Sequence, residues 1–205
     1  MPARIIAIEG SDGVGKATQT QKLVEHLSKD GFSVASMSFP RYGTPAGRKI
    51  KNALFNSLID PIEMAKLFHE DRKAALNDIN KMVENNDFVV FDRYKYSSMA
   101  HMAARSEEPD KIIEKIKEFE KEIPEADLVI VISISPELSQ KMIRDKNKDL
   151  HEVDIEYLRK TNTLYEKLAE ANKWILINGE KNGDVISIEE MHEKIYSKVK
   201  EFFSI

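Results

Sequence analysis

Short apolar runs alternate with amphipathic segments along the whole chain. Runs with the β-branched or alternating composition of strands occupy residues 4–10, 32–40, 87–93, 127–135 and 173–179. Polar and apolar residues recur at helical spacing in residues 16–31, 44–57, 60–85, 96–105, 107–122, 152–172 and 187–203. Strands that alternate with helices predict a parallel sheet with helices on both faces. We therefore expect a three-layer α/β fold on a five-stranded parallel sheet.

The pattern continues without interruption over all 205 residues. The chain has no internal repeat, no low-complexity tract and no linker rich in Pro, Gly or Ser. A chain of this length is long enough to bury one sizeable core. We expect a single domain that spans residues 1–205.

Composition and charge narrow the classes of function. Hydrophobic residues make up 41% of the chain, which is too many for a disordered protein. The formal net charge is −4, so no overall positive field attracts nucleic acid or an acidic membrane, and an anionic substrate needs local Arg and Lys side chains. The absence of cysteine excludes disulfides and thiolate metal sites. The longest apolar run, 128–132, is too short to span a bilayer, and the first ten residues resemble a strand more than a signal peptide, so we expect a cytoplasmic protein.

The segment between the first strand and the first helix nearly matches a phosphate-binding loop. Gly10, Gly15 and Lys16 satisfy the spacing G-x-x-x-x-G-K in the strand–loop–helix context that the motif requires. Backbone N–H groups of such a loop turn onto phosphate oxygens, and the helix N-terminus adds its positive end. We predict a P-loop NTPase fold that binds ATP through Gly10, Ser11, Asp12, Gly13, Val14, Gly15, Lys16, Ala17 and Thr18.

One position of this loop departs from the motif. Ala17 stands where a Ser or Thr hydroxyl normally holds the magnesium ion of the nucleotide. Thr18 is not an automatic replacement, because one residue along a helix turns a side chain by about 100°. We expect Mg²⁺ as a cofactor, held by nucleotide oxygens, water and the nearby carboxylates Asp12 and Asp92.

Three further segments indicate a small acceptor. The sequences "FPRY" at 39–42 and "FDRY" at 91–94 end the second and third strands, and ligands of open parallel sheets bind beyond the carboxyl ends of strands. In "LFHEDR", Phe68 and Arg72 are four residues apart and share one helical face.

Together these segments resemble the thymidylate kinases, P-loop enzymes that transfer the γ-phosphoryl group of ATP to dTMP in dTTP synthesis. The resemblance covers nearly the whole chain and rests on "IAIEGSDGVGK", "FPRYG", "LFxxxR", "DRYxYSS" and "TLYEKLAE". Only the first segment is specific by itself, whereas the five are specific in combination. The resemblance implies ATP and dTMP as partners, the products dTDP and ADP, and a homodimer.

The resemblance also suggests a role for individual residues. Phe68 resembles the ring that stacks on thymine, and Arg72 resembles the Arg that reaches a thymine carbonyl. Asp12 resembles the Asp that contacts the deoxyribose or its phosphate-binding arginine. The implied substrate-binding residues are Asp12, Phe39, Arg41, Tyr42, Phe68, Arg72, Arg93, Ser97, Ser98 and His101.

His101 is a departure from the family pattern. Many family members carry Tyr or Phe at this position, against the sugar, so the discrimination against ribonucleotides stays open, as does the choice between dTMP and dUMP.

The chemistry requires positive charge more than a base, because the acceptor phosphate is already anionic near neutral pH. The resemblance implies that Arg41 and Arg93 bind the acceptor phosphate. It also implies that a lid supplies further cations, here from a segment at about 143–152. The expected catalytic residues are Lys16, Arg93, Arg41, Arg144, Lys146 and Lys148. Family lids usually carry several arginines, and Lys cannot form a bidentate fork, so the lid cation that acts is left open.

Other interpretations remain at this stage. Phe68 is compatible with a core position, and Arg93 with an ion pair at a strand end. A deoxynucleoside kinase would need a carboxylate base, for which Glu9 or Asp92 is available, and another nucleoside monophosphate kinase would use the same scaffold. Ala17 and the Lys-rich lid also fit a nucleotide-binding protein without catalysis.

Overall fold

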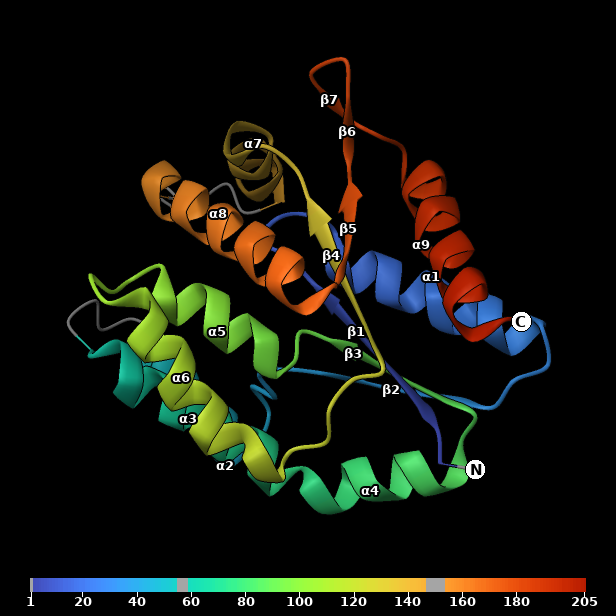
Figure 1. Cartoon of the computed structure of the whole chain (residues 1–205), viewed down its shortest axis with the longest axis horizontal. Helices are drawn as coiled ribbons and strands as arrows, with labels where there is room; N and C mark the ends of the chain where they lie inside the picture. The colour runs from blue at the N-terminus through green and yellow to red at the C-terminus, as the bar shows by residue number, and fades with distance from the viewer. Residues whose placement is uncertain (1, 55–58, 147–153) are drawn as a thin grey trace.

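The computed structural model describes residues 2–54, 59–146 and 154–205. Its centre is a five-stranded sheet in which every pairing is parallel and the strand order is β2-β3-β1-β4-β5 (Figure 1). The strands are β1 Arg4–Glu9, β2 Val34–Ser38, β3 Phe88–Asp92, β4 Leu128–Ser133 and β5 Ile175–Asn178. Each of the five predicted strands is present, within slightly shorter bounds.

Helices cover both faces of this sheet, which confirms the predicted α/β class (Figure 1). They are α1 Lys16–Lys29, α2 Pro45–Leu54, α3 Pro61–Ala74, α4 Leu76–Asn85, α5 Lys95–Ala103, α6 Pro109–Phe119, α7 Pro136–Lys146, α8 Ile155–Asn172 and α9 Ile188–Phe203. A 3₁₀ turn, η1 Glu120–Glu122, follows α6, and two short strands, β6 Glu180–Lys181 and β7 Asp184–Val185, form a hairpin.

The alternation of side chains along the strands divides the core in two. On β1, Ile5 and Ala7 pack with the α2–α6 side and with α8, whereas Ile6 and Ile8 pack with α1 and α9. Figure 1 shows the same division, with α1 and α9 together on one side of the sheet and α3, α5, α6 and α8 on the other. Because β1, β3 and β4 are buried on both faces, their sequences read as continuous apolar runs.

Two predicted helices are interrupted in the structure. The predicted helix at 60–85 begins at the expected cap, since Asp60 Oδ1 accepts hydrogen bonds from the N–H groups of Ile62 and Glu63, but it breaks at Ala75. The Ala75 N–H donates to the Arg72 carbonyl three residues back (2.9 Å), and α4 starts at Leu76. The predicted helix at 107–122 likewise ends as η1. The break at Ala75 depends on tertiary contacts, because no Gly or Pro stands there. The second helix has a local reason to end, since Pro124 follows η1 by two residues.

Three segments differ in other ways. Helix α7 and the β6–β7 hairpin occupy residues to which the sequence analysis assigned no element. The predicted helix at 152–172 begins at Ile155, where the side chain of Asp154 caps it. None of the helices in the described ranges is long and apolar enough to cross a membrane.

Candidate active site

The loop between β1 and α1 has the conformation that its glycines predict. Gly10 has a φ of 137°, and a Cβ there would lie 2.4 Å from the carbonyl oxygen of Ile132 on β4. Gly13 has a φ of 84°, and a Cβ there would lie 2.8 Å from the Ser139 carbonyl oxygen on α7. These close approaches let the loop fold over the carboxyl ends of β1 and β4, with its N–H groups at the start of α1.

Lys16, the first residue of α1, is buried inside this loop. Its Nζ donates to the main-chain oxygen of Ser11 at 2.5 Å. Burial lowers the pKa of Lys16 to about 7, and the positive charge of Arg93 acts in the same direction, although the carboxylates of Asp12, Asp92 and Glu9 oppose it. A phosphate group beside Nζ would favour the charged ammonium form.

A cavity of about 140 Å³ lies beyond the carboxyl ends of β2 and β3. This position is typical of a small-molecule site in an open parallel sheet. Nine of the ten residues assigned to substrate binding line it, namely Asp12, Phe39, Tyr42, Phe68, Arg72, Arg93, Ser97, Ser98 and His101. The remaining lining residues, which the sequence analysis did not single out, are Pro40, Leu54, Tyr94, Met102, Arg105 and Tyr157.

Asp12 and Arg93 join the phosphate-binding loop to this cavity. Arg93 follows β3 with a φ of 61°, an uncommon conformation for a residue other than glycine, and its N–H donates to the Ile8 carbonyl at 3.1 Å. From there Arg93 Nη2 hydrogen-bonds to Asp12 Oδ1. Burial opposes the charge of Asp12, but Arg93, His101 and Lys16 outweigh it and lower the pKa of Asp12. Arg93 therefore pairs with the loop aspartate, and not with its neighbour Asp92.

Arg41 is the one predicted substrate residue that does not line the cavity. Its backbone N–H donates to Asp71 Oδ2 at 2.7 Å, its Nε to Asp71 Oδ1 at 3.1 Å and its Nη2 to the Asp71 carbonyl at 2.7 Å. Its guanidinium carbon also lies 5.9 Å from the centre of the Phe39 ring. In this structure Asp71 on α3 therefore holds the guanidinium beside the end of β2.

Arg72 forms the other end of the cavity and is almost fully buried, with 1% of its surface exposed. Its Nε donates to both carboxylate oxygens of Glu120 at 3.1 Å, and its Nη2 donates to Glu120 Oε1 at 2.5 Å and to Ser98 Oγ at 2.8 Å. Burial alone would raise the pKa of Glu120, but Arg72 and His69 lower it to about 2. Arg72 is thus a fixed, charged donor at the cavity wall, and not a solvated helix charge.

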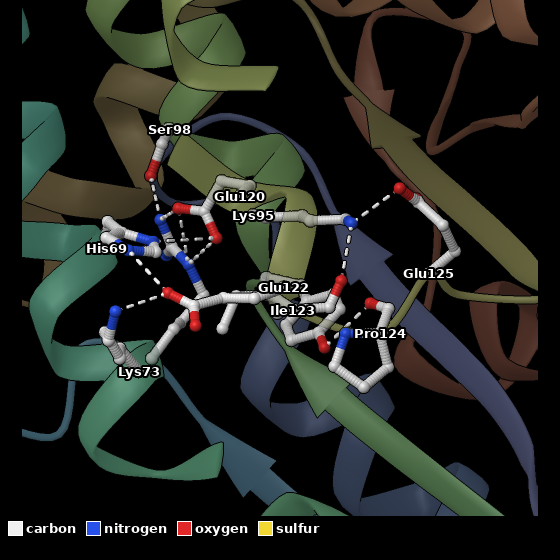
Figure 2. A network of polar contacts seen from close by, with 11 residues as sticks. His69, Lys73, Lys95, Ser98, Glu120, Glu122, Ile123, Pro124 and Glu125 are labelled. Carbon is white, nitrogen blue, oxygen red and sulfur yellow. Dashed lines mark hydrogen bonds and ion pairs between the residues drawn. The ribbon is translucent and has the colours of Figure 1, made fainter. Parts of the chain in front are cut away.

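The segment that carries Glu120 is itself anchored on both sides (Figure 2). Lys73 and His69 from α3 lie 2.7 Å and 3.4 Å from Glu122 Oε1. Lys95 of α5 is buried and donates to the Ile123 carbonyl at 3.0 Å and to Glu125 Oε1 at 2.6 Å. The sequence analysis predicted only a helix at 107–122 in this region, and no local signal marks Glu120 as the partner of Arg72.

His101 lies between Arg93, which follows β3, and Tyr157 at the start of α8. Its Nε2 lies 3.2 Å from Arg93 Nη1, and its Nδ1 lies 2.7 Å from the hydroxyl oxygen of Tyr157. Burial lowers the pKa of His101 to about 3, although Asp12 acts in the opposite direction. The imidazole is therefore neutral near pH 7. Arg105 could have been noticed from its spacing of four residues after His101, whereas Tyr157 follows the lid segment and carries no sequence signal.

Glu9, the candidate base of a deoxynucleoside kinase, is fully buried below the cavity. Its Oε1 accepts from the Tyr94 N–H at 2.8 Å, and its Oε2 accepts from the hydroxyls of Ser97 and, at 3.0 Å, Tyr165. Burial raises the pKa of Glu9 despite these donors. Both oxygens are occupied, and Glu9 does not line the acceptor cavity. The Ser97 hydroxyl is likewise directed to Glu9.

A second cavity lies between α1 and the carboxyl ends of β2 and β3, and Ala17 lines it. Asp92, Thr20 and Ser38 also line it. Thr20 is 6% exposed, and its hydroxyl oxygen has no hydrogen-bond partner among the described residues. These oxygens are the donor type that Mg²⁺ prefers, so the residues fit the ion. Burial raises the pKa of Asp92. The other expected metal ligand, Asp12, does not line this cavity but the acceptor cavity.

The described residues would not bind a metal ion by themselves. No group of three or more His, Asp or Glu side chains within the described ranges is arranged to hold one. A magnesium ion at Asp92 would therefore also need nucleotide oxygens and water.

The predicted lid lies partly outside the described residues. Arg144 is exposed on α7, and Lys146 is the last residue of that helix. Lys148 belongs to 147–153, which the structure does not describe. Helix α7 begins directly after β4 and contacts Gly13 of the phosphate-binding loop, so the lid segment starts beside this loop.

Known proteins resemble this chain over most of its length. A family model described as thymidylate kinase matches residues 8–195. A thymidylate kinase of Dictyostelium discoideum is 32% identical over 186 residues, which cover 90% of this chain and 81% of that protein. A probable thymidylate kinase of Methanosphaera stadtmanae is 33% identical over 201 residues, with coverage of 95% and 98%. The solved structure of a thymidylate kinase from Candida albicans aligns with a TM-score of 0.75 and 19% identity over 98% of this chain and 92% of that one, which supports the fold.

Proposed function

The chain belongs to the thymidylate kinase family, and on this premise we propose that it transfers the γ-phosphoryl group of ATP to dTMP through the residues described above. The products are dTDP and ADP. The observation that carries the assignment of the site is the Asp12–Arg93 pair, because it connects the ATP-binding loop directly to the acceptor cavity.

The two ends of the acceptor cavity suit the two ends of dTMP. Phe68 offers a ring for stacking on the base, and Arg72, fixed by Glu120, offers a donor to a thymine carbonyl. Arg93 and Tyr42 lie toward the loop and suit the phosphate. The acceptor phosphate would then lie close to Lys16, where transfer requires it.

Phosphoryl transfer at this site depends on positioning and on positive charge. Lys16 and Arg93 would bring two anionic phosphates together and stabilise the charge of the transferring group, and Arg41 and Arg144 are further candidates. When bound, Mg²⁺ would neutralise phosphate oxygens, and Asp92 with the hydroxyls of Thr20 and Ser38 would hold it. No base is required, since the acceptor phosphate is already anionic.

The position of the carboxylates argues against a deoxynucleoside kinase. Such an enzyme needs a carboxylate beside the acceptor hydroxyl, but Glu9 is bonded on both oxygens and Asp92 lines the cavity of Ala17. A nucleotide-binding protein without catalysis is disfavoured because Lys16, Arg72 and Arg93 all keep positions suited to the reaction.

The finer features rest on the family resemblance. We propose Mg²⁺ as the ion, a homodimer as the assembly, the cytoplasm as the location, and residues 1–205 as one catalytic domain. All four are supported by the likeness to thymidylate kinases.

One assay tests the activity and the site together. ADP release from ATP is measured with dTMP, dUMP, UMP and thymidine as acceptors, in the wild type and in Arg93→Ala. We expect dTMP to be the best acceptor and R93A to lose about 10²-fold or more in kcat/KM. Preference for thymidine would indicate a nucleoside kinase. A loss of less than a few-fold in R93A would reduce Arg93 to a structural ion pair.

A further inference from the structure

Tyr157 lines the acceptor cavity although it belongs to none of the segments that carry the family resemblance. It lies in the first turn of α8, three residues after the capping Asp154. Its hydroxyl oxygen is 2.7 Å from His101 Nδ1, and the guanidinium carbon of Arg105 is 5.0 Å from the centre of its ring. The side chain is therefore held between two polar groups at the wall of the cavity.

The direction of these hydrogen bonds follows from Arg93. A guanidinium only donates, so His101 Nε2, 3.2 Å from Arg93 Nη1, must be the acceptor. A neutral imidazole that accepts at Nε2 carries its single proton on Nδ1. His101 Nδ1–H then donates to the Tyr157 hydroxyl oxygen, and the arginine thereby sets the tautomer of the histidine.

Among the described residues, the groups next to the Tyr157 hydroxyl are mainly donors, which leaves its proton available to a ligand acceptor. Its oxygen accepts from His101, and the guanidinium of Arg105 only donates. The third neighbour, the Thr161 hydroxyl, spends its own proton on the main-chain oxygen of Tyr157 at 2.8 Å. The chain of contacts from Asp12 through Arg93 and His101 places Tyr157 on the side of the cavity that suits the phosphate, away from Glu120. An oxygen atom of a ligand in this part of the cavity would complete the series of hydrogen bonds.

We propose that the Tyr157 hydroxyl donates a hydrogen bond to an oxygen at the sugar–phosphate end of the acceptor nucleotide, and that His101 is the positioning residue that directs it. The inference rests on the proposed function, because it requires dTMP in this cavity. It gives His101 a role different from that of an aromatic ring against the sugar.

The first test compares dTMP binding to the wild type, Tyr157→Phe and Tyr96→Phe by titration calorimetry. Tyr96 is the matched control, because its hydroxyl donates to Glu125 at 2.8 Å and does not line the cavity. We expect Y157F to weaken dTMP binding by about 2- to 12-fold, the range of one neutral hydrogen bond, with unchanged ATP affinity. The Y96F variant should bind dTMP like the wild type.

The outcomes separate this inference from the proposed function. Equal dTMP affinity in wild type and Y157F would overturn the role of Tyr157 and leave the kinase assignment intact. Failure of the wild type to bind dTMP would overturn both.

Two analogues identify the accepting oxygen. If it belongs to the phosphate, the Y157F effect persists with 2′,3′-dideoxythymidine monophosphate and disappears with thymidine. If the accepting oxygen is the 3′-hydroxyl, the Y157F effect disappears with 2′,3′-dideoxythymidine monophosphate and persists with thymidine. An effect that persists with both analogues would exclude the phosphate and the 3′-hydroxyl, which are the two acceptors that the proposal allows, and would contradict it.

The tautomer of His101 is measured independently by ¹⁵N NMR of histidine-labelled protein. We expect a protonated Nδ1 and an unprotonated Nε2 near pH 7. The opposite tautomer would make Tyr157 donate to His101 Nδ1, which would remove its proton from the cavity and overturn the proposal.

Discussion

Glu120 binds Arg72 through both of its carboxylate oxygens, and the two side chains are buried to 98% or more on elements that are 48 residues apart in sequence. A buried ion pair of this kind does not by itself indicate high stability, because desolvation offsets much of the attraction. Its effect at this site is geometric, since it fixes a charged donor at the end of the cavity that we propose for the base. On this proposal, Glu120 controls how Arg72 is positioned to contact a base.

Replacing Glu120 should weaken acceptor binding more than donor binding. Glu120→Gln keeps the shape but leaves the Arg72 charge without a full counter-charge, so we expect a loss of about 1–3 kcal/mol in unfolding free energy. We also expect a higher KM for dTMP with little change for ATP. Thermal unfolding and steady-state kinetics check both effects, and Glu122→Gln on the same turn is the control. An equal rise in both KM values would mean that Glu120 supports the fold in general.

Lys16 should be required for transfer and dispensable for folding. The only hydrogen bond described for the Lys16 side chain is to the main-chain oxygen of Ser11 in the same loop. Lys16→Ala therefore removes the charge near the phosphates without opening the core. We expect kcat/KM to fall by about 10²-fold or more, as for loss of an electrostatic stabiliser. Circular dichroism should show an unchanged fold. Near-normal turnover in a folded K16A would remove the phosphate-binding role from this loop.

ATP binding should take up a proton above neutral pH. The pKa of Lys16 is lowered from 10.5 to about 7 by burial, and phosphate oxygens raise it again in the complex. At a pH between the Lys16 pKa of the free protein and the higher Lys16 pKa of the complex, Lys16 is deprotonated in the free protein and protonated in the complex. ATP affinity should therefore fall as the pH rises above about 7.

Calorimetry at pH 8 in buffers of different ionisation enthalpy measures this proton uptake. Lys16→Met should abolish it, whereas Lys22→Met, which removes a partly exposed lysine of the same helix, should retain it. Equal uptake in K16M would assign the proton to another group.

Phe68 should matter for the acceptor alone. It lines the acceptor cavity from α3 and is only partly buried against the core. Phe68→Ala should raise the KM for dTMP and leave ATP affinity unchanged. The rise should correspond to a loss of about 1–3 kcal/mol in binding free energy, the value of a base–aromatic stack. Phe202→Ala, at a 52% exposed position on α9, is the control for loss of a ring elsewhere. A drop in ATP affinity or a large loss of stability in F68A would assign Phe68 to the core.

A hydroxyl at position 17 should tighten the magnesium requirement. Ala17 is exposed at the start of α1 and shares a cavity with Asp92, so Ala17→Ser adds an oxygen ligand without a steric conflict. We expect the magnesium concentration at half-maximal rate to fall, with a smaller change in kcat. Ala53→Ser, on α2, controls for an added hydroxyl away from this cavity. An unchanged magnesium titration in folded A17S would mean that other groups already place the ion completely.

The local patterns of the sequence predicted the scaffold. Buried parallel strands require continuous apolar runs, and the phosphate-binding loop requires glycine where φ is positive and backbones approach closely, as at Gly10. These requirements act within a few residues, so they are visible without a structure. The break at Ala75 was not visible, because alanine is the best helix former and only packing decides that α3 ends there.

The residue types of the site were determined by the sequence, but their partners were decided by the tertiary structure. Phe68, Arg72 and Arg93 were identified from motifs, whereas the pairing of Arg72 with Glu120, of Arg41 with Asp71 and of His101 with Tyr157 joins segments that are 30 to 56 residues apart. Such pairs have no periodic signal, since each depends on how separate helices meet at the edge of the sheet. A sequence therefore shows which charged residues are available. The packing of helices against the sheet decides which of these charges are paired with a counter-charge and which face the cavity.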